Sequence, residues 1–381
     1  MKDICNYSKC TGCFTCQNLC PNKCIQLKAD KHGELHPVIE TNKCTECGLC
    51  YKRCPANAST LTPFLISPDC YAAWNEDLLN RKLNASGGIA EAMCSYVIEK
   101  LGGVVYGVKW DKFLRPVFDR IDNVDDLQYL RGSKYVQAFV DNNYSKVRMD
   151  LLKGLFVLFI GTPCQVAGLK SYLSKKYENL ITCDLLCHGV PPYDYFSEEL
   201  KKITYRGFKD VNNCRFRGND DYNYSLSLWN GDKLVYTSRS VHSYYFLGFL
   251  TSIILRESCY TCCYSTDSRV SDITIGDFLG LGKLKTVEEN PLNVSVVVTN
   301  TESGSSFWTE ISKYNVKLKV EKREYAEAVA GGQSLRKSAT RNSKRNKFLA
   351  NYELKGYNSA IHNVLWKSIL LNMVLFRLKR R

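Results

Sequence analysis

The 381-residue sequence lacks any run of eighteen uninterrupted apolar residues, which argues against a membrane-spanning helix. Its first residues, MKDICNYSKC, lack the basic start and the apolar stretch of a secretory signal, so we expect a cytoplasmic protein. Most of the chain also lacks net charge. Residues 331–381 hold twelve Lys or Arg against one acidic residue, Glu353, and therefore carry +11 of the net charge of +14. Any contact with a polyanion would concern this tail and not the main body.

Cysteine, in contrast, is abundant, with nineteen residues. In a reducing compartment, thiols at ligand spacings are metal ligands or catalytic groups more often than disulfides. The chain is also longer than a single hydrophobic core usually fills, so we expect two or three domains.

Two runs of cysteines share one spacing, offset by 34 residues at every position. The first is Cys10, Cys13, Cys16 and Cys20 followed by Pro21, and the second is Cys44, Cys47, Cys50 and Cys54 followed by Pro55. Three closely spaced thiolates bind one 4Fe-4S cluster, while the fourth, before proline, reaches the neighbouring cluster. We therefore predict crossed ligands, with Cys10, Cys13, Cys16 and Cys54 on one cluster and Cys44, Cys47, Cys50 and Cys20 on the other. The alternative is zinc, which prefers two separated cysteine pairs.

These runs predict a small α+β dicluster ferredoxin-like domain over residues 1–62. Cys5 and Cys24 lie outside the spacing, and we interpret both as packed or spare thiols.

After Pro63 the sequence alternates between predicted strands and helices. A helix is predicted over 89–100 and a strand over 104–108, and the apolar run 155–160 predicts a strand buried on both faces. A helix over 165–177 and a strand over 180–186 complete a βαβ unit. Cys164 and Cys187 follow its two strands, at the sheet edge where ligands bind in parallel α/β proteins. Cys259, Cys262 and Cys263 precede a further strand over 272–275.

Five motifs in this region resemble, in order and spacing, the coenzyme F-420 hydrogenase/dehydrogenase beta-subunit family, which includes chlorophyll-pathway reductases. They are Ser86-Gly87-Gly88, Arg131-Gly132-Ser133-Lys134-Tyr135, Gly161-Thr162-Pro163-Cys164-Gln165, Cys187-His188-Gly189, and Cys259-x2-Cys262 with Ser271-Asp272-Ile273 and Gly276-Asp277. The resemblance covers about residues 75–330. It implies an α/β domain with a mixed, largely parallel sheet that binds FAD and a 4Fe-4S cluster.

The same resemblance implies that Cys164, Cys187, Cys259 and Cys262 bind a third 4Fe-4S cluster. It implies that FAD lies near Ser86, Gly87, Gly88, Gly132, Ser133 and Lys134. Glycines at a helix start and a nearby lysine suit a pyrophosphate, although glycines there are also ordinary turn residues. Cys183 and Cys263 do not match the pattern, and Cys70, Cys94 and Cys214 are expected to be packing residues. His188 is expected either to tune the cluster or to be a structural histidine.

The predicted function is that of an iron–sulfur flavoprotein oxidoreductase, with no residue assigned as catalytic. Electrons would pass through 4Fe-4S clusters to or from FAD, and a redox partner protein and a small-molecule or deazaflavin-type substrate are expected. The alternative is a non-catalytic subunit that relays electrons to a partner enzyme.

Residues 331–381 are predicted to form a basic, partly helical tail. From Asn358 an apolar helix ends in Arg377-Leu378-Lys379-Arg380-Arg381. Such a helix covers the protein's own surface or a partner's, or lies peripherally on an anionic membrane at its inner face. Nucleic acid is not an expected partner, because the tail offers few aromatic side chains for base stacking.

Overall fold

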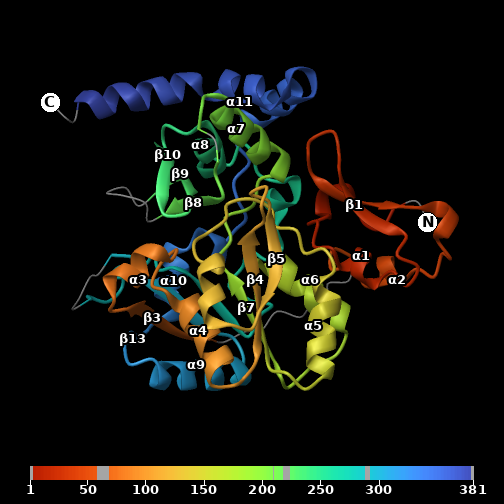
Figure 1. Cartoon of the computed structure of the whole chain (residues 1–381), viewed down its shortest axis with the longest axis vertical. Helices are drawn as coiled ribbons and strands as arrows, with labels where there is room; N and C mark the ends of the chain where they lie inside the picture. Colours follow the sequence, from red (N-terminus) through yellow and green to blue (C-terminus); the bar gives the residue numbers. More distant parts are fainter. Residues whose placement is uncertain (1–2, 58–67, 209, 218–223, 288–291, 379–381) are drawn as a thin grey trace.

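The computed structural model describes residues 3–57, 68–208, 210–217, 224–287 and 292–378. Three parts are visible in Figure 1: a cysteine-rich N-terminal module, a central sheet covered by helices, and an outer layer that includes the C-terminal helix. The predicted end of the first domain, at residue 62, falls in residues 58–67 and so lies outside the described residues.

The N-terminal module, residues 3–57, is an antiparallel hairpin with short helices on either side of it in sequence. Its elements are η1 Tyr7–Lys9, α1 Thr15–Leu19, β1 Ile25–Ala29, β2 Leu35–Ile39, η2 Thr41–Lys43 and α2 Leu49–Lys52. Its small core contains Ile4, Cys24, Ile25 and Cys54, with further cysteines packed around it. So small a core stabilises a domain poorly, and metal binding commonly supplies the missing stability.

The central domain contains a mixed eight-stranded sheet in the order β13-β3-β12-β11-β7-β6-β4-β5. The strands are β3 Asp69–Asn75, β4 Val104–Trp110, β5 Pro116–Ile121, β6 Val157–Gly161, β7 Leu180–Leu185, β11 Ile273–Asp277, β12 Ser295–Thr299 and β13 Leu318–Arg323. β11, β7, β6 and β4 are parallel, whereas β5 at one edge and β12, β3 and β13 at the other pair antiparallel. The predicted mixed α/β fold is therefore confirmed, with the parallel strands at the centre of the sheet.

Helices cover both faces of this sheet, as the uninterrupted apolar run of β6 predicts. Leu158 packs with α4 Ile89–Glu99 and α9 Glu302–Tyr314 on one face. Val157 and Phe159 pack with α5 Asn143–Leu152 and α6 Pro163–Leu173 on the other. Phe14 and Leu35 of the N-terminal module join this second cluster, so the module docks on the α5 and α6 side.

The predicted elements recur with small shifts at their ends. α6 begins at Pro163 and not at Gln165, because Gln165 Oε1 accepts hydrogen bonds from the backbone N and Oγ1 of Thr162, at 3.0 and 2.9 Å, and proline suits the first helical position. The helix ends at Leu173 because Ser174 adopts a left-handed conformation, with φ of 62°.

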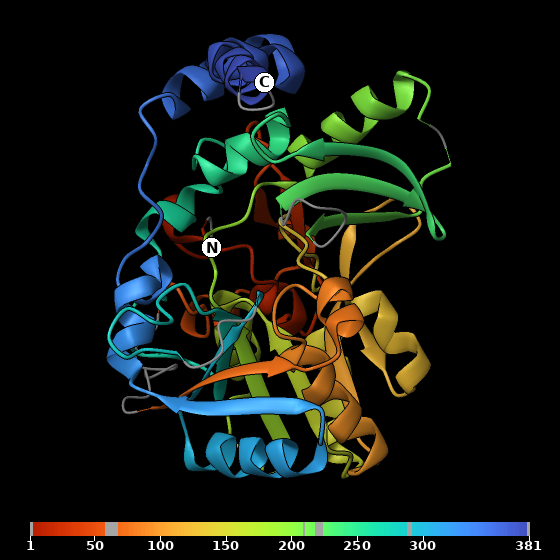
Figure 2. The same ribbon diagram turned by 90° about the vertical axis from the view of Figure 1, so that its left-hand side faces the viewer.

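An outer layer packs above the carboxyl ends of the parallel strands. It contains α7 Tyr193–Tyr205, α8 Tyr244–Leu250, α11 Arg345–Leu378 and a three-stranded antiparallel sheet of β8 Asn213–Arg217, β9 Tyr224–Asn230 and β10 Lys233–Arg239 (Figure 2). The remaining elements are α3 Leu78–Leu83, η4 Val124–Leu130, η5 Glu257–Thr261, α10 Tyr325–Gly331 and η6 Gln333–Leu335. The layer has its own aromatic core, which includes Tyr195, Phe196, Phe216, Tyr245 and Tyr357.

The tail helix begins earlier than the sequence predicts, at Arg345, and is interrupted at Gly356, where φ is 73° and ψ is 177°. Beyond this kink, Tyr357, Ile361, Val364 and Leu365 are buried in the aromatic core. This part of the tail therefore covers the protein's own surface, as one of the three alternatives predicted.

Candidate cofactor sites

The two cysteine loops of the N-terminal module have the same backbone conformation. Gly12 and Phe14 in the first loop have φ of 61° and 65°, and Glu46 and Gly48, each 34 residues later, have φ of 54° and 71°. Left-handed residues between right-handed ones turn successive backbone N–H groups inward, a geometry common around iron–sulfur clusters. The repeat in the sequence is thus also a repeat of backbone geometry.

The cysteines of the two runs gather in two groups, each of which contains one cysteine from the other run. Burial and the negative charges of Cys54 and Cys10 raise the pKa of Cys13 to about 11. Burial and the charges of Cys13, Cys10 and Cys54 likewise raise the pKa of Cys16. Cys54, from the second run, therefore lies with the first three cysteines of the first run.

The second group forms at the other end of the module. Cys20, Cys44, Cys47 and Cys50 line one hollow, together with Cys24 and residues of the 44–50 loop. Burial and the charges of Cys47 and Cys20 raise the pKa of Cys50. Cys47 is exposed, so this group is the one nearer to solvent.

Cys5 and Cys24 lie beside the two groups. The Cys24 Sγ is 3.3 Å from the Cys20 Sγ. Hydrogen bonding to Cys10 and Cys54 raises the pKa of the Cys5 thiol. Each extra cysteine is thus placed to donate a hydrogen bond to predicted cluster ligands.

A third group lies where the strands β6 and β7 end. Cys164 is in the first turn of α6, Cys187 follows β7, Cys259 is in η5, and Cys262 comes directly after η5. Burial, followed by the charges of Cys164 and Cys262, raises the pKa of Cys187 to about 12. Burial and the charges of Cys187 and Cys262 also raise the pKa of Cys259. The four predicted ligands of the third cluster therefore lie together, each half-buried.

This third group suits an iron–sulfur cluster chemically. Burial and the charges of neighbouring thiolates disfavour ionisation of Cys164, Cys187 and Cys259, and a cationic metal centre reverses that preference. One hydrogen-bond donor to the sulfurs is in place, because the Gly189 N–H lies 3.4 Å from the Cys187 Sγ. The Thr162 Oγ1 also lies 3.2 Å from the Cys164 Sγ, but its hydrogen is donated to Gln165 Oε1. A Cβ on Gly189, at φ of 125°, would lie 3.2 Å from the Cβ of Cys259, so glycine allows these two loops to approach.

Zinc fits these groups less well. Within the described part of the chain, no three histidine, cysteine or acidic side chains lie close enough together to bind one metal ion. In the N-terminal module the cysteines also follow one another in runs of three and not as two separated pairs, which favours a 4Fe-4S cluster over zinc.

The first and third groups are neighbours across α6. A Cβ on Gly168 would lie 3.2 Å from the Cys13 Cβ and 2.7 Å from both the Thr15 Oγ1 and the Tyr144 hydroxyl. Cys164 lies in α6, one turn before Gly168. Burial and the charges of Cys262, Cys259 and Cys13 raise its pKa. α6 therefore contacts the first cysteine loop at Gly168 and carries Cys164 of the third group at its start.

The remaining cysteines lie outside these groups. Cys70, Cys94, Cys183 and Cys214 are buried in the hydrophobic clusters, and Cys263 is exposed. His188 lies 3.2 Å from the Ser252 Oγ and meets the Phe249 ring edge-on, and burial lowers its pKa. A neutral histidine with these partners fits the structural interpretation.

The two loops predicted to contact FAD are joined by an ion pair. Arg131 Nη2 lies 2.6 Å from Glu91 Oε1, and Glu91 is in the first turn of α4, directly after the loop of residues 86–88. Gly87 serves packing, because a Cβ there would lie 2.3 Å from the Ala73 carbonyl oxygen. Gly88 has φ of 83° and caps α4.

Ser86 and Gly132 fit a bound ligand better than Lys134 does. The Ser86 hydroxyl is buried and has no hydrogen-bond partner, and nothing would lie within 4 Å of a Cβ on Gly132. The Lys134 ammonium donates to four backbone carbonyl oxygens of residues 129–132, at 3.0 to 3.3 Å. Burial lowers the pKa of Lys134 to about 7. Lys134 thus holds the shape of the loop that presents Gly132 and Ser133.

A polar cluster beside this loop was not predicted from the sequence. Asp277, at the carboxyl end of β11, accepts two hydrogen bonds from Arg217 Nη1, at 2.9 and 2.8 Å, and one from the Tyr224 hydroxyl at 3.4 Å. The charges of Arg217 and Asp277 also act on Tyr135 in the 131–135 loop. Asp277 could have been recognised in the sequence, because it ends an apolar strand. Arg217 and Tyr224 belong to the separate small sheet, and no sequence pattern relates them to Asp277.

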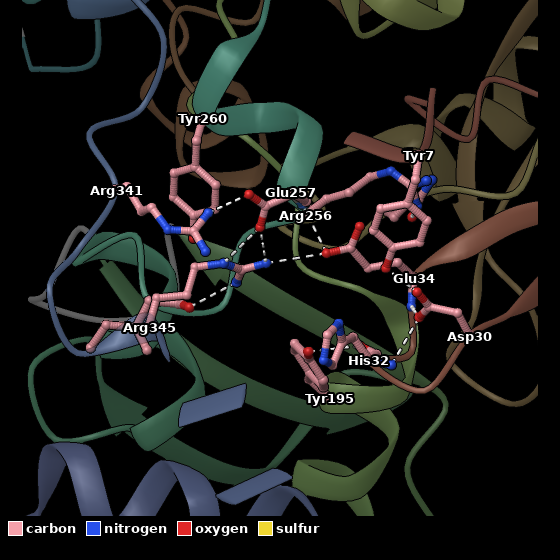
Figure 3. Close-up of polar contacts among 12 residues, drawn as sticks. Tyr7, Asp30, His32, Glu34, Tyr195, Arg256, Glu257, Tyr260, Arg341 and Arg345 are labelled. Carbon is pink, nitrogen blue, oxygen red and sulfur yellow. Dashed lines mark hydrogen bonds and ion pairs between the residues drawn. The ribbon is translucent and has the colours of Figure 1, made fainter. Parts of the chain in front are cut away.

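A buried charge network holds the N-terminal module on the body. Arg345 Nη2 lies 3.2 Å from Glu34 Oε1 and 3.3 Å from Glu257 Oε2, and the Glu257 N–H donates to Glu34 at 2.8 Å (Figure 3). Arg256, fully buried, donates to the carbonyl oxygens of Cys10 and Leu35 at 3.0 and 2.7 Å. The network therefore connects the first cysteine loop, the η5 segment that carries Cys259, and the start of α11.

Two parts of the chain match known protein families. Residues 156–324 match the family described as the C terminus of the coenzyme F420 hydrogenase/dehydrogenase beta subunit, and residues 9–58 match the 4Fe-4S dicluster domain. No curated protein matches the chain. Among solved structures, a chain of the F420-reducing [NiFe] hydrogenase complex from Methanosarcina barkeri aligns with a TM-score of 0.46 and 15% identity, over 79% of this chain and 91% of that one.

Proposed function

We propose that this chain, which joins a 4Fe-4S dicluster domain to a domain of the F420 hydrogenase/dehydrogenase beta-subunit type, is an iron–sulfur flavoprotein oxidoreductase. The observation that carries the proposal is the position of the third cysteine group. It lies beside Cys13 on one side, across α6, and at the sheet edge that also carries Asp277 on the other.

The arrangement supports a defined order of electron carriers. The exposed Cys47 marks the second cysteine group as the entry point for electrons from a redox partner protein. The first group, which contains Cys13, comes next, and the third group follows across α6. Electron transfer between clusters needs short separations and little rearrangement, and the contact of α6 with Cys13 and Thr15 provides a rigid link.

FAD would be held between the 86–88 and 131–135 loops. When bound, FAD exchanges electrons with an iron–sulfur cluster and hydride with an organic substrate. The Glu91–Arg131 ion pair fixes the two loops relative to each other, and Ser86 offers an unused hydroxyl. Arg217 and Asp277 supply charge at this edge, and Asp277 keeps Arg217 oriented. We propose a deazaflavin or another small molecule as the substrate.

The test is the iron, sulfide and flavin content of the anaerobically purified chain. Three clusters and one flavin give about twelve iron atoms and one FAD per chain. Cys187→Ser should reduce the iron to about eight, whereas the exposed neighbour variant Cys263→Ser should retain about twelve. About eight iron atoms in the unmodified chain would remove the third cluster. Twelve iron atoms without flavin would instead favour the relay subunit over the enzyme.

A further inference from the structure

The distal part of α11 exposes an apolar surface that no described part of the chain covers. From residue 370 onward, Phe376 packs on Arg239 and His242. The other large apolar side chains are between 41% and 61% exposed: Leu370, Leu371, Met373, Val374, Leu375 and Leu378. In Figure 1 this end of α11 extends beyond the outer layer toward the C-terminus. A group of exposed apolar side chains this dense is typical of a binding surface.

A polar hollow lies next to this apolar surface on the same helix. It is lined by Lys202 of α7 and by Asn358, Ser359, His362, Asn363 and Trp366 of α11. Lys202 contributes a positive charge to it, although the Glu199 carboxylate lies 3.7 Å from the ammonium, and the other polar groups of the lining can both donate and accept hydrogen bonds. Trp366, Leu370, Met373 and Arg377 follow one another at spacings of four and three residues. Two residues of the apolar surface, Leu370 and Met373, therefore lie on the same side of the helix as the hollow.

Charges of one sign accompany these residues. The sequence contains no Asp or Glu after Glu353, whereas Lys355, Lys367 and Arg377 lie on α11 and three further basic residues follow at 379–381. Two copies of this surface would repel each other, which argues against self-association. An anionic surface would be attracted.

We propose that α11 attaches the protein peripherally to an anionic lipid bilayer. Residues 370–378 lie in the interface between headgroups and acyl chains, Trp366 sits at its boundary, and the hollow faces lipid phosphates. An amphipathic helix with Leu, Met, Val and Trp on one side and basic residues beside them is the type that lies in such an interface.

The helix lies on the membrane and does not cross it. By length and composition α11 is the one helix in the described part of the chain that could span a bilayer. However, Ile361, Val364 and Leu365 are buried against the protein, and Asn372 donates to the Val241 carbonyl oxygen at 3.0 Å. Insertion across the bilayer would break these contacts, so only the exposed side is available to lipid.

The test is flotation of the full anaerobic protein with vesicles of phosphatidylcholine alone and of phosphatidylcholine mixed with phosphatidylglycerol. We expect binding only to the mixed vesicles, decreasing as salt increases. Arg377→Gln should weaken binding roughly fivefold, the equivalent of about 1 kcal/mol per basic residue. Leu371→Glu with Val374→Glu should abolish it.

The matched control is Leu354→Glu, an equally radical change at a residue that is 80% exposed and precedes the kink of α11. This variant should bind vesicles like the unmodified protein, and all variants should keep the same cluster absorbance. Absent binding to anionic vesicles, or binding that survives the double substitution, would overturn the proposal. So would concentration-dependent dimerisation that the double substitution removes, or protein that alkaline carbonate fails to extract from the vesicles.

Discussion

Glu34 offers the sharpest test of how the dicluster domain is held on the body. Its side chain and that of Arg345 are each 1% exposed, and Glu34 accepts hydrogen bonds from Arg345 and from the Glu257 N–H. Replacing Glu34 with Ala leaves a buried arginine with one carboxylate partner fewer and an amide without an acceptor. Breaking a buried ion pair in this way costs about 3–5 kcal/mol.

We expect Glu34→Ala to lower the free energy of unfolding by about 3–5 kcal/mol, measured by anaerobic urea denaturation. The matched control is Glu40→Ala, because Glu40 pairs with Lys43 on the same module but is 54% exposed. This substitution should lower the free energy of unfolding by no more than about 1 kcal/mol. The reasoning would be refuted if the two variants lost the same stability. A double-mutant cycle with Arg345→Met should give a coupling of at least about 0.5 kcal/mol.

The same pair gives a pH prediction. Burial alone would raise the pKa of Glu34, but hydrogen bonding to His36 and the charges of Arg256 and Arg345 outweigh it, and the pKa is lowered. A carboxylate with a lowered folded pKa stabilises the protein above its unfolded pKa of about 4.3, and this contribution is lost only as pH falls further. Although burial opposes it, hydrogen bonding to Cys10 and Glu34 raises the pKa of His36. The stability difference between Glu34→Gln and the unmodified protein should therefore decrease as pH rises from about 6 to 9, but keep the part that comes from Arg256 and Arg345. A difference that disappeared within this range would contradict the assignment.

Three further predictions concern the cofactor sites. Gly132→Ala should lower the flavin content. The control is Gly102→Ala, also at a positive φ and with an equally open Cβ position, which should cost about 1–2 kcal/mol of strain without loss of flavin. Equal flavin contents in the two variants would contradict the proposed site. Gly168→Val should destabilise by about 1–3 kcal/mol and slow electron transfer from the dicluster domain in stopped-flow measurements, unlike Lys170→Ala on the same helix. Cys24→Ala should keep all the iron but lower the reduction potential of one cluster by roughly 20–60 mV, because a hydrogen bond worth about 0.5–1.5 kcal/mol is lost. An unchanged redox titration would mean that Cys24 is a packing residue only.

The sequence predicted those helices and strands whose positions are determined by neighbouring residues. The apolar run of β6, the cap of α6 and the βαβ unit recur within a few residues of their predicted positions, because periodicity and turn residues act over short distances. The antiparallel edge strands β12, β3 and β13 and the small sheet were not predicted. Their pairing partners lie far apart along the chain, and spacing within one segment carries no information about such partners.

Some features of the candidate sites could likewise be predicted from the sequence, and others could not. Cysteine spacing predicted the two groups of the N-terminal module, and the family match over residues 156–324 supports the resemblance. Gly87 was expected beside a phosphate, yet it packs against Ala73, because strand packing and ligand binding both favour glycine. Arg256 and Arg217 act through partners far away in sequence, and a single arginine in a sequence gives no indication of burial. The binding of FAD and the cytoplasmic location stay predictions.

The network around Glu34 also sets an order for biosynthesis. Glu34 and Arg345 are 311 residues apart, so the ribosome makes the first long before the second. The dicluster domain consequently emerges without one of its buried partners, and its docking is completed only after the start of α11 has been made. Until then Glu34 lacks its arginine partner. The full stability of the docked domain is therefore a property of the finished chain.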